Sequence, residues 1–113
     1  MMAPAATELG FELRVLAENP DVSAVSAVAH AAVGDYTDYE TLLAFARGVD
    51  VLTFDHEHVP GEHLKALQAE GINVQPGPDA LLHAQDKLVM RAAVDRLGLP
   101  NPRWAAVASV ADL

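Results

Sequence analysis

Two carboxylates and a lysine are the side chains of this sequence best placed, by type and spacing, to do chemistry. Asp55 and Glu57 follow a strand-like run at 50–54, and Lys87 lies near the start of an amphipathic helix. In an open parallel sheet, ligands bind at the carboxyl ends of the strands, where carboxylates accept hydrogen bonds from sugar hydroxyls or an amine. A lysine at a helix start opposes the helix dipole, so a phosphate contact explains Lys87 better than helix stability does. The plainer alternatives are a solvated acidic loop and a surface lysine.

A second candidate, for a metal ion, is the cluster of His56, Glu57, His58 and His63. A His-x-His pair can place two imidazoles on one side of a loop, and zinc or iron would accept them together with a carboxylate. The sequence offers no third ligand at helical spacing and no His-Glu-x-x-His pattern, which argues against a metal site. We expect His30 and His83 to face solvent or to cap helices.

Composition argues against several other classes. The net charge of −9 leaves no basic face for nucleic acid, and the absence of cysteine rules out disulfides and thiolate metal sites. The longest apolar run, 22–33, is too short to span a bilayer, and the N-terminus lacks the basic segment of a secretory signal. The sequence therefore predicts a cytoplasmic protein that binds neither membrane nor nucleic acid.

Strand-length apolar runs alternate with helical patterns along most of the chain. Strands are predicted at 11–16, 31–33, 50–54 and 72–74, and helices at 22–29, from a Thr37/Glu40 capping box to Gly48, and from Pro60 to Gly71. Strands separated by helices favour a parallel sheet with right-handed crossovers. A last helix, containing Lys87, is predicted to end at Gly98, and a further strand is predicted after it at 103–107.

Charge divides the chain at the Pro/Gly turn 75–78. Residues 1–76 hold twelve acidic against three basic residues, whereas residues 77–113 hold four of each. We therefore predict an incomplete α/β domain over 1–76, followed by a linker and the beginning of a second domain over 77–113. A compact globule of 12.0 kDa would expose roughly 6,000 Å².

Specific strings carry more information than spacing does. In order, they are Arg-Val-Leu-Ala-Glu-Asn-Pro-Asp (14–21), Val-Gly-Asp-Tyr (33–36), Asp-Val-Leu-Thr-Phe-Asp-His-Glu-His-Val-Pro (50–60), Gln-Pro-Gly-Pro (75–78) and Ala-Gln-Asp-Lys (84–87). Together they resemble the 5-(carboxyamino)imidazole ribonucleotide synthase family, the ATPase subunit of phosphoribosylaminoimidazole carboxylase, in the ATP-grasp superfamily. The resemblance covers nearly all of the chain. Its most specific parts are the Thr-Phe-acid-x-Glu-x-Val-Pro string and Gln-Asp-Lys.

The resemblance implies an ATP-dependent carbon–nitrogen ligase of purine biosynthesis. ATP and bicarbonate would form carboxyphosphate, and the carboxylate would pass to the exocyclic amine of 5-aminoimidazole ribonucleotide, with magnesium required and a homodimer common. Lys87 matches the family position, Arg or Lys, that contacts ATP, and Glu57 matches the glutamate near the ribonucleotide. Asp55 matches a substrate-side position where glutamate is usual, and His56 stands where an apolar residue is common. No catalytic residue is assigned within the chain.

The resemblance also implies a Rossmann-like parallel sheet of a pre-ATP-grasp domain that lacks its first strand, plus the hinge helix and first strand of an ATP-grasp domain. Family members carry a strand and a glycine-rich loop ahead of the matching segment, and their magnesium carboxylates lie beyond it. The missing strand would lie between those at 11–16 and 50–54 and leave two unpaired edges, which invite association. We expect the chain alone to be marginally stable or self-associating, and inactive.

Two alternatives stay open. Another ATP-grasp ligase or carboxylase would share this domain and the hinge lysine but use a different substrate. A non-catalytic α/β nucleotide-binding module, of receiver or stress-protein type, would need a complete sheet within 113 residues. Asp55 could imitate the phosphorylated aspartate of a receiver, but the acidic pair that comes after a receiver's first strand is missing.

Overall fold

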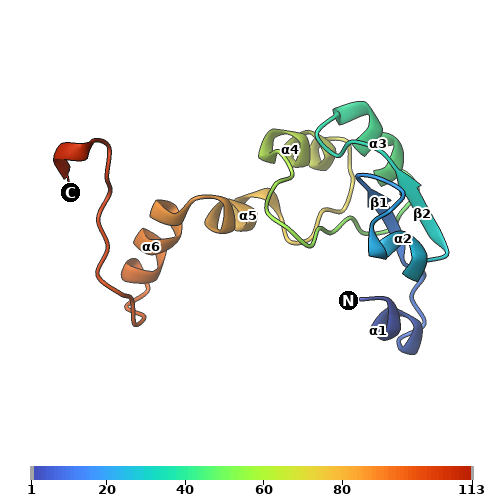
Figure 1. The fold of residues 1–113 in the computed structure, drawn as a ribbon, viewed down its shortest axis with the longest axis horizontal. Helices are drawn as coiled ribbons and strands as arrows, with labels where there is room; N and C mark the ends of the chain where they lie inside the picture. The colour runs from blue at the N-terminus through green and yellow to red at the C-terminus, as the bar shows by residue number, and fades with distance from the viewer. Residues whose placement is uncertain (1, 113) are drawn as a thin grey trace.

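A computed structural model describes residues 2–112, which form a rounded body with a long extension on one side (Figure 1). The elements are α1 (Ala3–Glu8), β1 (Arg14–Ala17), α2 (Ser23–Ala27), β2 (His30–Val33), α3 (Tyr39–Ala46), α4 (Gly61–Ala69), α5 (Pro78–Gln85), α6 (Lys87–Arg96) and the 3₁₀ turn η1 (Val110–Asp112). The extension holds α6 and the C-terminal segment, and α5 connects it to the body. The radius of gyration is 17.4 Å, against about 13 Å for a compact chain of this length. The exposed area of 7885 Å² likewise exceeds that of a compact globule.

The β-structure consists of two separate parallel pairs. β1 and β2 pair in parallel, with Arg14 opposite His30, and an isolated parallel bridge joins Leu52 to Val74. In this bridge the Leu52 amide donates to the Asn73 carbonyl at 2.9 Å. No backbone pairing links the two pairs among the described residues. The predicted fold class, a parallel α/β sheet with a gap, is confirmed.

The predicted strands at 50–54 and 72–74 are wrong in length, since each is reduced to a single bridged residue. Each segment has a partner on one side only, so no second ladder extends the pairing. The predicted strand at 103–107 is also wrong, because these residues are exposed and have no strand beside them.

The core is aliphatic and lies between α3, α4, α5 and the Leu52–Val74 bridge. Its buried members are Leu42, Leu43, Ala46, Leu52, Val59, Leu64, Leu67, Val74 and Leu81. Leu64 and Leu67 are 0% exposed, as their helical spacing after Pro60 predicts. Leu16 of β1 packs against the same cluster, so both parallel pairs share one core.

α3 begins at a different cap from the one predicted. The side chain of Asp38 accepts a hydrogen bond from the Thr41 amide at 2.9 Å and another from the Thr41 hydroxyl at 2.6 Å. Thr37 cannot serve as the cap, because its hydroxyl donates to Asp35 at 2.6 Å in the preceding turn. The predicted Thr37/Glu40 capping box is therefore wrong by one residue. Thr41 holds the pKa of the Asp38 carboxyl below its ordinary value of 3.8.

Replacing Asp38 with alanine should lower the melting temperature of the chain by roughly 5 °C, because the Thr41 amide loses its acceptor. Asparagine at the same position keeps an acceptor oxygen and should cost far less. Thermal melting followed by circular dichroism of the two variants checks this. Equal melting temperatures for Asp38→Ala and Asp38→Asn would contradict the role of Asp38 as the cap.

The C-terminal region holds two helices where the sequence predicted one. α5 begins at Pro78, and the chain turns to an extended conformation at Asp86 (φ −118°, ψ 112°) before α6. The Asp86 side chain caps α6 by accepting from the amides of Leu88 at 2.8 Å and Val89 at 3.2 Å. α6 ends, as predicted, at Gly98, whose φ of 66° suits glycine. Among residues 2–112, no helix is long and apolar enough to cross a membrane.

Hydrogen bonds fasten the segment after Gly98 to α6. Asn101 donates to the Arg91 carbonyl at 3.0 Å and to the Asp95 carboxylate at 2.7 Å, and the Trp104 indole donates to Asp95 at 2.8 Å. The bonds from Asn101 and Trp104 hold the pKa of Asp95 below its ordinary value of 3.8. This stabilisation is therefore complete above pH 3.8 and is lost as the pH falls through the lowered pKa.

Replacing Asp95 with alanine removes both acceptor oxygens, so it should release the Trp104 indole and shift its fluorescence to longer wavelength at neutral pH. Trp104 is the only tryptophan of the chain, so its emission reports this contact alone. The parent chain should show the same shift only in acid, below the pKa of Asp95. Asp79→Ala, at a side chain that is 94% exposed, is the matched control. Identical spectra for Asp95→Ala and the parent would contradict the contact.

Candidate functional site

The predicted substrate-side residues lie on a loop that comes after the Leu52 bridge and is fixed at its far end. Asp55 and Glu57 are exposed, whereas Val59 is 6% exposed within the core and Pro60 is the N-cap of α4. The loop thus presents two carboxylates to solvent from between two anchored points. Such carboxylates can accept hydrogen bonds from hydroxyls or amines.

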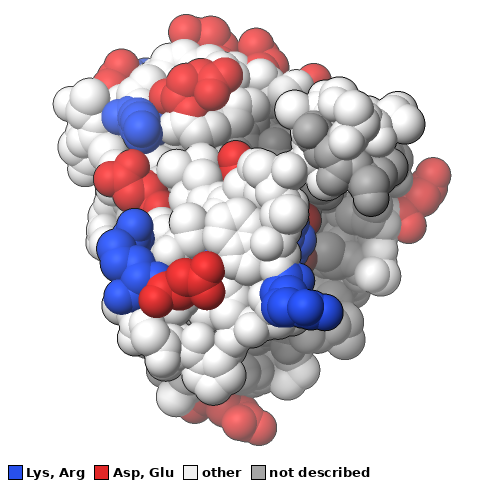
Figure 2. Space-filling model, turned by 90° about the vertical axis from the view of Figure 1, so that its left-hand side faces the viewer, with Lys and Arg blue, Asp and Glu red and all other residues white. Residues whose placement is uncertain are grey.

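Lys87 is the first residue of α6, and its side chain is exposed. It forms no ion pair with any residue that the structure describes, so its ammonium remains available to an anion. Figure 2 views the molecule from the α6 end and shows acidic and basic side chains mixed around a neutral area. Attraction of a phosphate there would therefore depend on individual cations and not on a broad positive field.

Gln85 connects this helix start to the loop. Its side-chain nitrogen donates to the backbone carbonyls of Glu57 at 2.8 Å and Val59 at 3.0 Å. The structure therefore brings the backbone of Glu57 against a residue two positions before Lys87. It places no hydrogen bond or ion pair between the side chains of Glu57 and Lys87 in the described part of the chain. The sequence singled out the Gln-Asp-Lys string but assigned Gln85 no role.

Three polar side chains meet at the carboxyl ends of the parallel segments. Tyr36 follows β2, and its ring lies 5.0 Å from the ring of His56. Burial and a hydrogen bond to Glu18, which follows β1, raise the pKa of the Tyr36 phenol. The sequence missed Glu18, which directly follows β1, and Tyr36, which comes three residues after the end of β2. Asp55 and Glu57 therefore lie at the edge of the sheet where the parallel strands end.

The histidines do not assemble as a metal centre would require. His56 and His58 lie with their rings 5.3 Å apart, and the Nδ1 of His56 accepts from the His58 amide at 3.2 Å. His63 is occupied elsewhere, since its Nε2 lies 2.9 Å from the Thr37 carbonyl. Within residues 2–112, no group of three or more His, Asp or Glu side chains is arranged to hold a metal ion. His83 is exposed and lies 3.1 Å from the Asp79 carbonyl.

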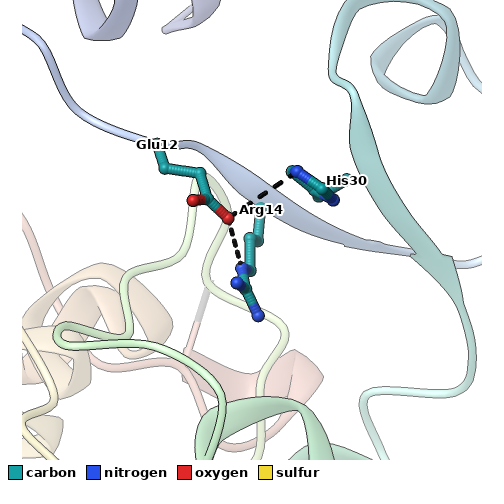
Figure 3. Close-up of polar contacts among 3 residues, drawn as sticks. All are labelled: Glu12, Arg14 and His30. Atoms are coloured by element: carbon teal, nitrogen blue, oxygen red, sulfur yellow. Dashed lines mark hydrogen bonds and ion pairs between the residues drawn. The ribbon is translucent and has the colours of Figure 1, made fainter.

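A separate polar cluster lies at the opposite, amino ends of β1 and β2 (Figure 3). Glu12 accepts from Arg14 at 2.8 Å and lies 3.8 Å from His30, and the Arg14 bond lowers the pKa of Glu12. An open pocket of about 400 Å³ adjoins it, lined by Arg14, His30, Phe45 and Gly48 among others. This hollow therefore lies away from the edge that carries Asp55 and Glu57.

Comparison with known proteins links the chain to one group of enzymes. The profile of the ribonucleotide synthetase preATP-grasp domain matches residues 1–85. The N5-carboxyaminoimidazole ribonucleotide synthase of Corynebacterium ammoniagenes is 53% identical over 112 residues, which are 99% of this chain and 27% of that protein. The chain thus spans about a quarter of the length of this relative.

Solved structures agree with this match. The N5-carboxyaminoimidazole ribonucleotide synthetase of Thermotoga maritima gives a TM-score of 0.85 at 31% identity, over 98% of this chain and 31% of its own. The N5-carboxyaminoimidazole synthetase of Staphylococcus aureus, solved with ADP, gives a TM-score of 0.77 at 26% identity, over 87% of this chain and 26% of its own.

Proposed function

The chain belongs to the ribonucleotide synthetase preATP-grasp domain family, and on that premise we propose that it is part of a synthase that carboxylates 5-aminoimidazole ribonucleotide. ATP would phosphorylate bicarbonate to carboxyphosphate. The exocyclic amine would then take the carboxylate, forming an N–C bond and releasing phosphate. The observation that carries the proposal is the 53% identity to a synthase of this name along 99% of the chain.

Within this function, Glu57 and Asp55 would bind the ribonucleotide and Lys87 would bind ATP. Glu57 and Asp55 suit hydroxyl and amine groups, since ionised carboxylates only accept hydrogen bonds and repel phosphate. Lys87 is exposed and carries the opposite charge, so it suits the phosphates of the nucleotide. The ADP in the Staphylococcus aureus structure supports a nucleotide as the second ligand.

Magnesium belongs to the proposed reaction, but residues 2–112 offer no set of side chains that fits it. We therefore assign its ligands to none of the residues that the structure describes. The family resemblance implies a homodimer, and the proposal therefore includes a homodimeric synthase that acts in the cytoplasm.

The division into two domains stays a prediction, and the structure favours a boundary later than 76. Leu81 of α5 is 5% exposed and belongs to the core, whereas no residue of α6 does. We therefore place the joint between the two units at Asp86, where the chain is extended between α5 and α6.

A hybrid synthase tests the proposed function. In it, this chain replaces the matching 112 residues of the Corynebacterium ammoniagenes synthase. We expect ATP hydrolysis that depends on both bicarbonate and 5-aminoimidazole ribonucleotide, with none from this chain alone. A folded hybrid synthase that ignores the ribonucleotide but responds to an amino acid, a formyl donor or a biotin carrier would favour another ATP-grasp ligase.

A further inference from the structure

Gln85 joins two parts of the candidate site that are far apart in sequence. Its side-chain amide reaches back 28 residues to the Glu57 carbonyl at 2.8 Å and 26 residues to the Val59 carbonyl at 3.0 Å. A primary amide has two N–H bonds, so both of its protons are used by the 55–60 loop. Its oxygen lies 4.0 Å from the point that a Cβ on Gly61 would occupy, so the side chain also covers the first residue of α4.

The two acceptors of Gln85 differ in what holds them. Val59 is 6% exposed in the core, and its carbonyl is therefore a fixed point. Glu57 is exposed, and its backbone has no comparable anchor of its own. The bond to Val59 fixes the Gln85 side chain against the core. The bond to Glu57 then holds the backbone of the residue whose carboxylate faces the solvent.

The next two residues carry the connection to α6. Asp86 is extended and caps α6 through the amides of Leu88 and Val89. Lys87 is the first residue of the capped helix. Asp86 therefore fixes the start of α6, and its neighbour Gln85 is hydrogen-bonded to the loop that carries Glu57.

The geometry points to Gln85 as a positioning residue that holds the Glu57 loop and the start of α6 in one arrangement. This inference rests on the proposed function, because it takes Glu57 as a contact of the ribonucleotide and Lys87 as a contact of ATP. With both held through one amide, the ribonucleotide and the carboxyphosphate formed with ATP would meet at a fixed separation, which the passage of the carboxylate to the amine requires.

Gln85→Glu in the hybrid synthase tests the inference. The change replaces the amide NH₂ by oxygen, so two carbonyls face a carboxylate that cannot donate. We expect faster amide hydrogen exchange in peptides covering 55–60 and 86–90. We also expect the KM values for the ribonucleotide and for ATP each to rise about tenfold. Gln85→Met, which keeps the length but has no donor, should act in the same direction.

Gln68→Glu is the matched control, since it makes the same charge change at an exposed position of α4 and should leave every value at the parent level. Unchanged exchange at 55–60 in both Gln85 variants would overturn the inference. Faster exchange with unchanged KM values would overturn the positioning role and leave Gln85 a local support. An inactive parent hybrid would contradict the proposed function, and the exchange result would then decide alone whether Gln85 couples the two segments.

Discussion

Replacing Lys87 with alanine in the hybrid synthase should lower kcat/KM for ATP by about a hundredfold, as loss of one charge-stabilising donor does at other phosphate and oxyanion sites. The lysine is exposed, begins α6 and has no ion pair among the described residues, so its removal disturbs no internal contact. Steady-state kinetics with ATP as the varied substrate measure the effect. Arginine at the same position keeps the charge and should retain most of the activity.

Lys65→Ala is the control for this prediction. Lys65 is an exposed lysine of α4 that lies 3.7 Å from Asp79 on the surface, and its removal should change kcat/KM by less than about twofold. If Lys87→Ala were as active as Lys65→Ala, Lys87 would be an ordinary surface lysine and its assignment to ATP would fail. Thermal melting of the variants separates lost chemistry from lost folding.

Replacing Leu64 with alanine should remove most of the stability of the unit that precedes Asp86. Leu64 is 0% exposed and lies in a core that is built from a few small aliphatic side chains. Truncating a buried leucine costs about 2–5 kcal/mol, and a chain with an incomplete sheet should lie at the low end of the usual range, about 5 kcal/mol. Urea unfolding of the chain at low concentration, followed by circular dichroism, should show the midpoint falling close to zero.

Leu9→Ala provides the comparison for Leu64→Ala. Leu9 is 71% exposed, so the same chemical change there should alter the unfolding free energy by no more than about 0.5 kcal/mol. Similar losses at the two positions would mean that Leu64 does not lie in a packed core. An apparent molar mass that rises with protein concentration in light scattering would show the self-association that the incomplete sheet predicts.

Local patterns predicted α2, α3, α4 and α6 and the parallel direction of the strands, but neither α1 nor α5. The spacing of Leu64 and Leu67, the stop at Gly98 and the alternation of strands with helices all describe neighbours within one or two turns, and each is present in the structure. The lengths of the strands were not predicted, because a strand is as long as its partners allow. At 50–54 and 103–107, apolar composition alone could not show that such partners are missing.

Only part of the candidate site was predicted, because local sequence patterns do not show contacts between residues that are distant in sequence. Asp55, Glu57 and Lys87 stand out by type and by position beside an element, and the structure places the carboxylates at a strand end and the lysine at a helix start, as expected. Gln85 and Tyr36 act through contacts with residues distant in sequence, and no local pattern marks such contacts. The sequence predicted the helix start at Lys87, where α6 begins, but not the separate helix α5 that precedes it.

The position of the core relative to Asp86 has a consequence for how such a polypeptide can be divided. All nine members of the buried cluster precede that residue, and Ala93 of α6 lies outside the cluster, so a cut there would leave the whole cluster on one side. α6 and the residues C-terminal to it could then be exchanged as a cassette without repacking the first unit. The Gln85 amide and the Asp86 cap would both need to be preserved for the exchanged segment to keep the orientation of α6.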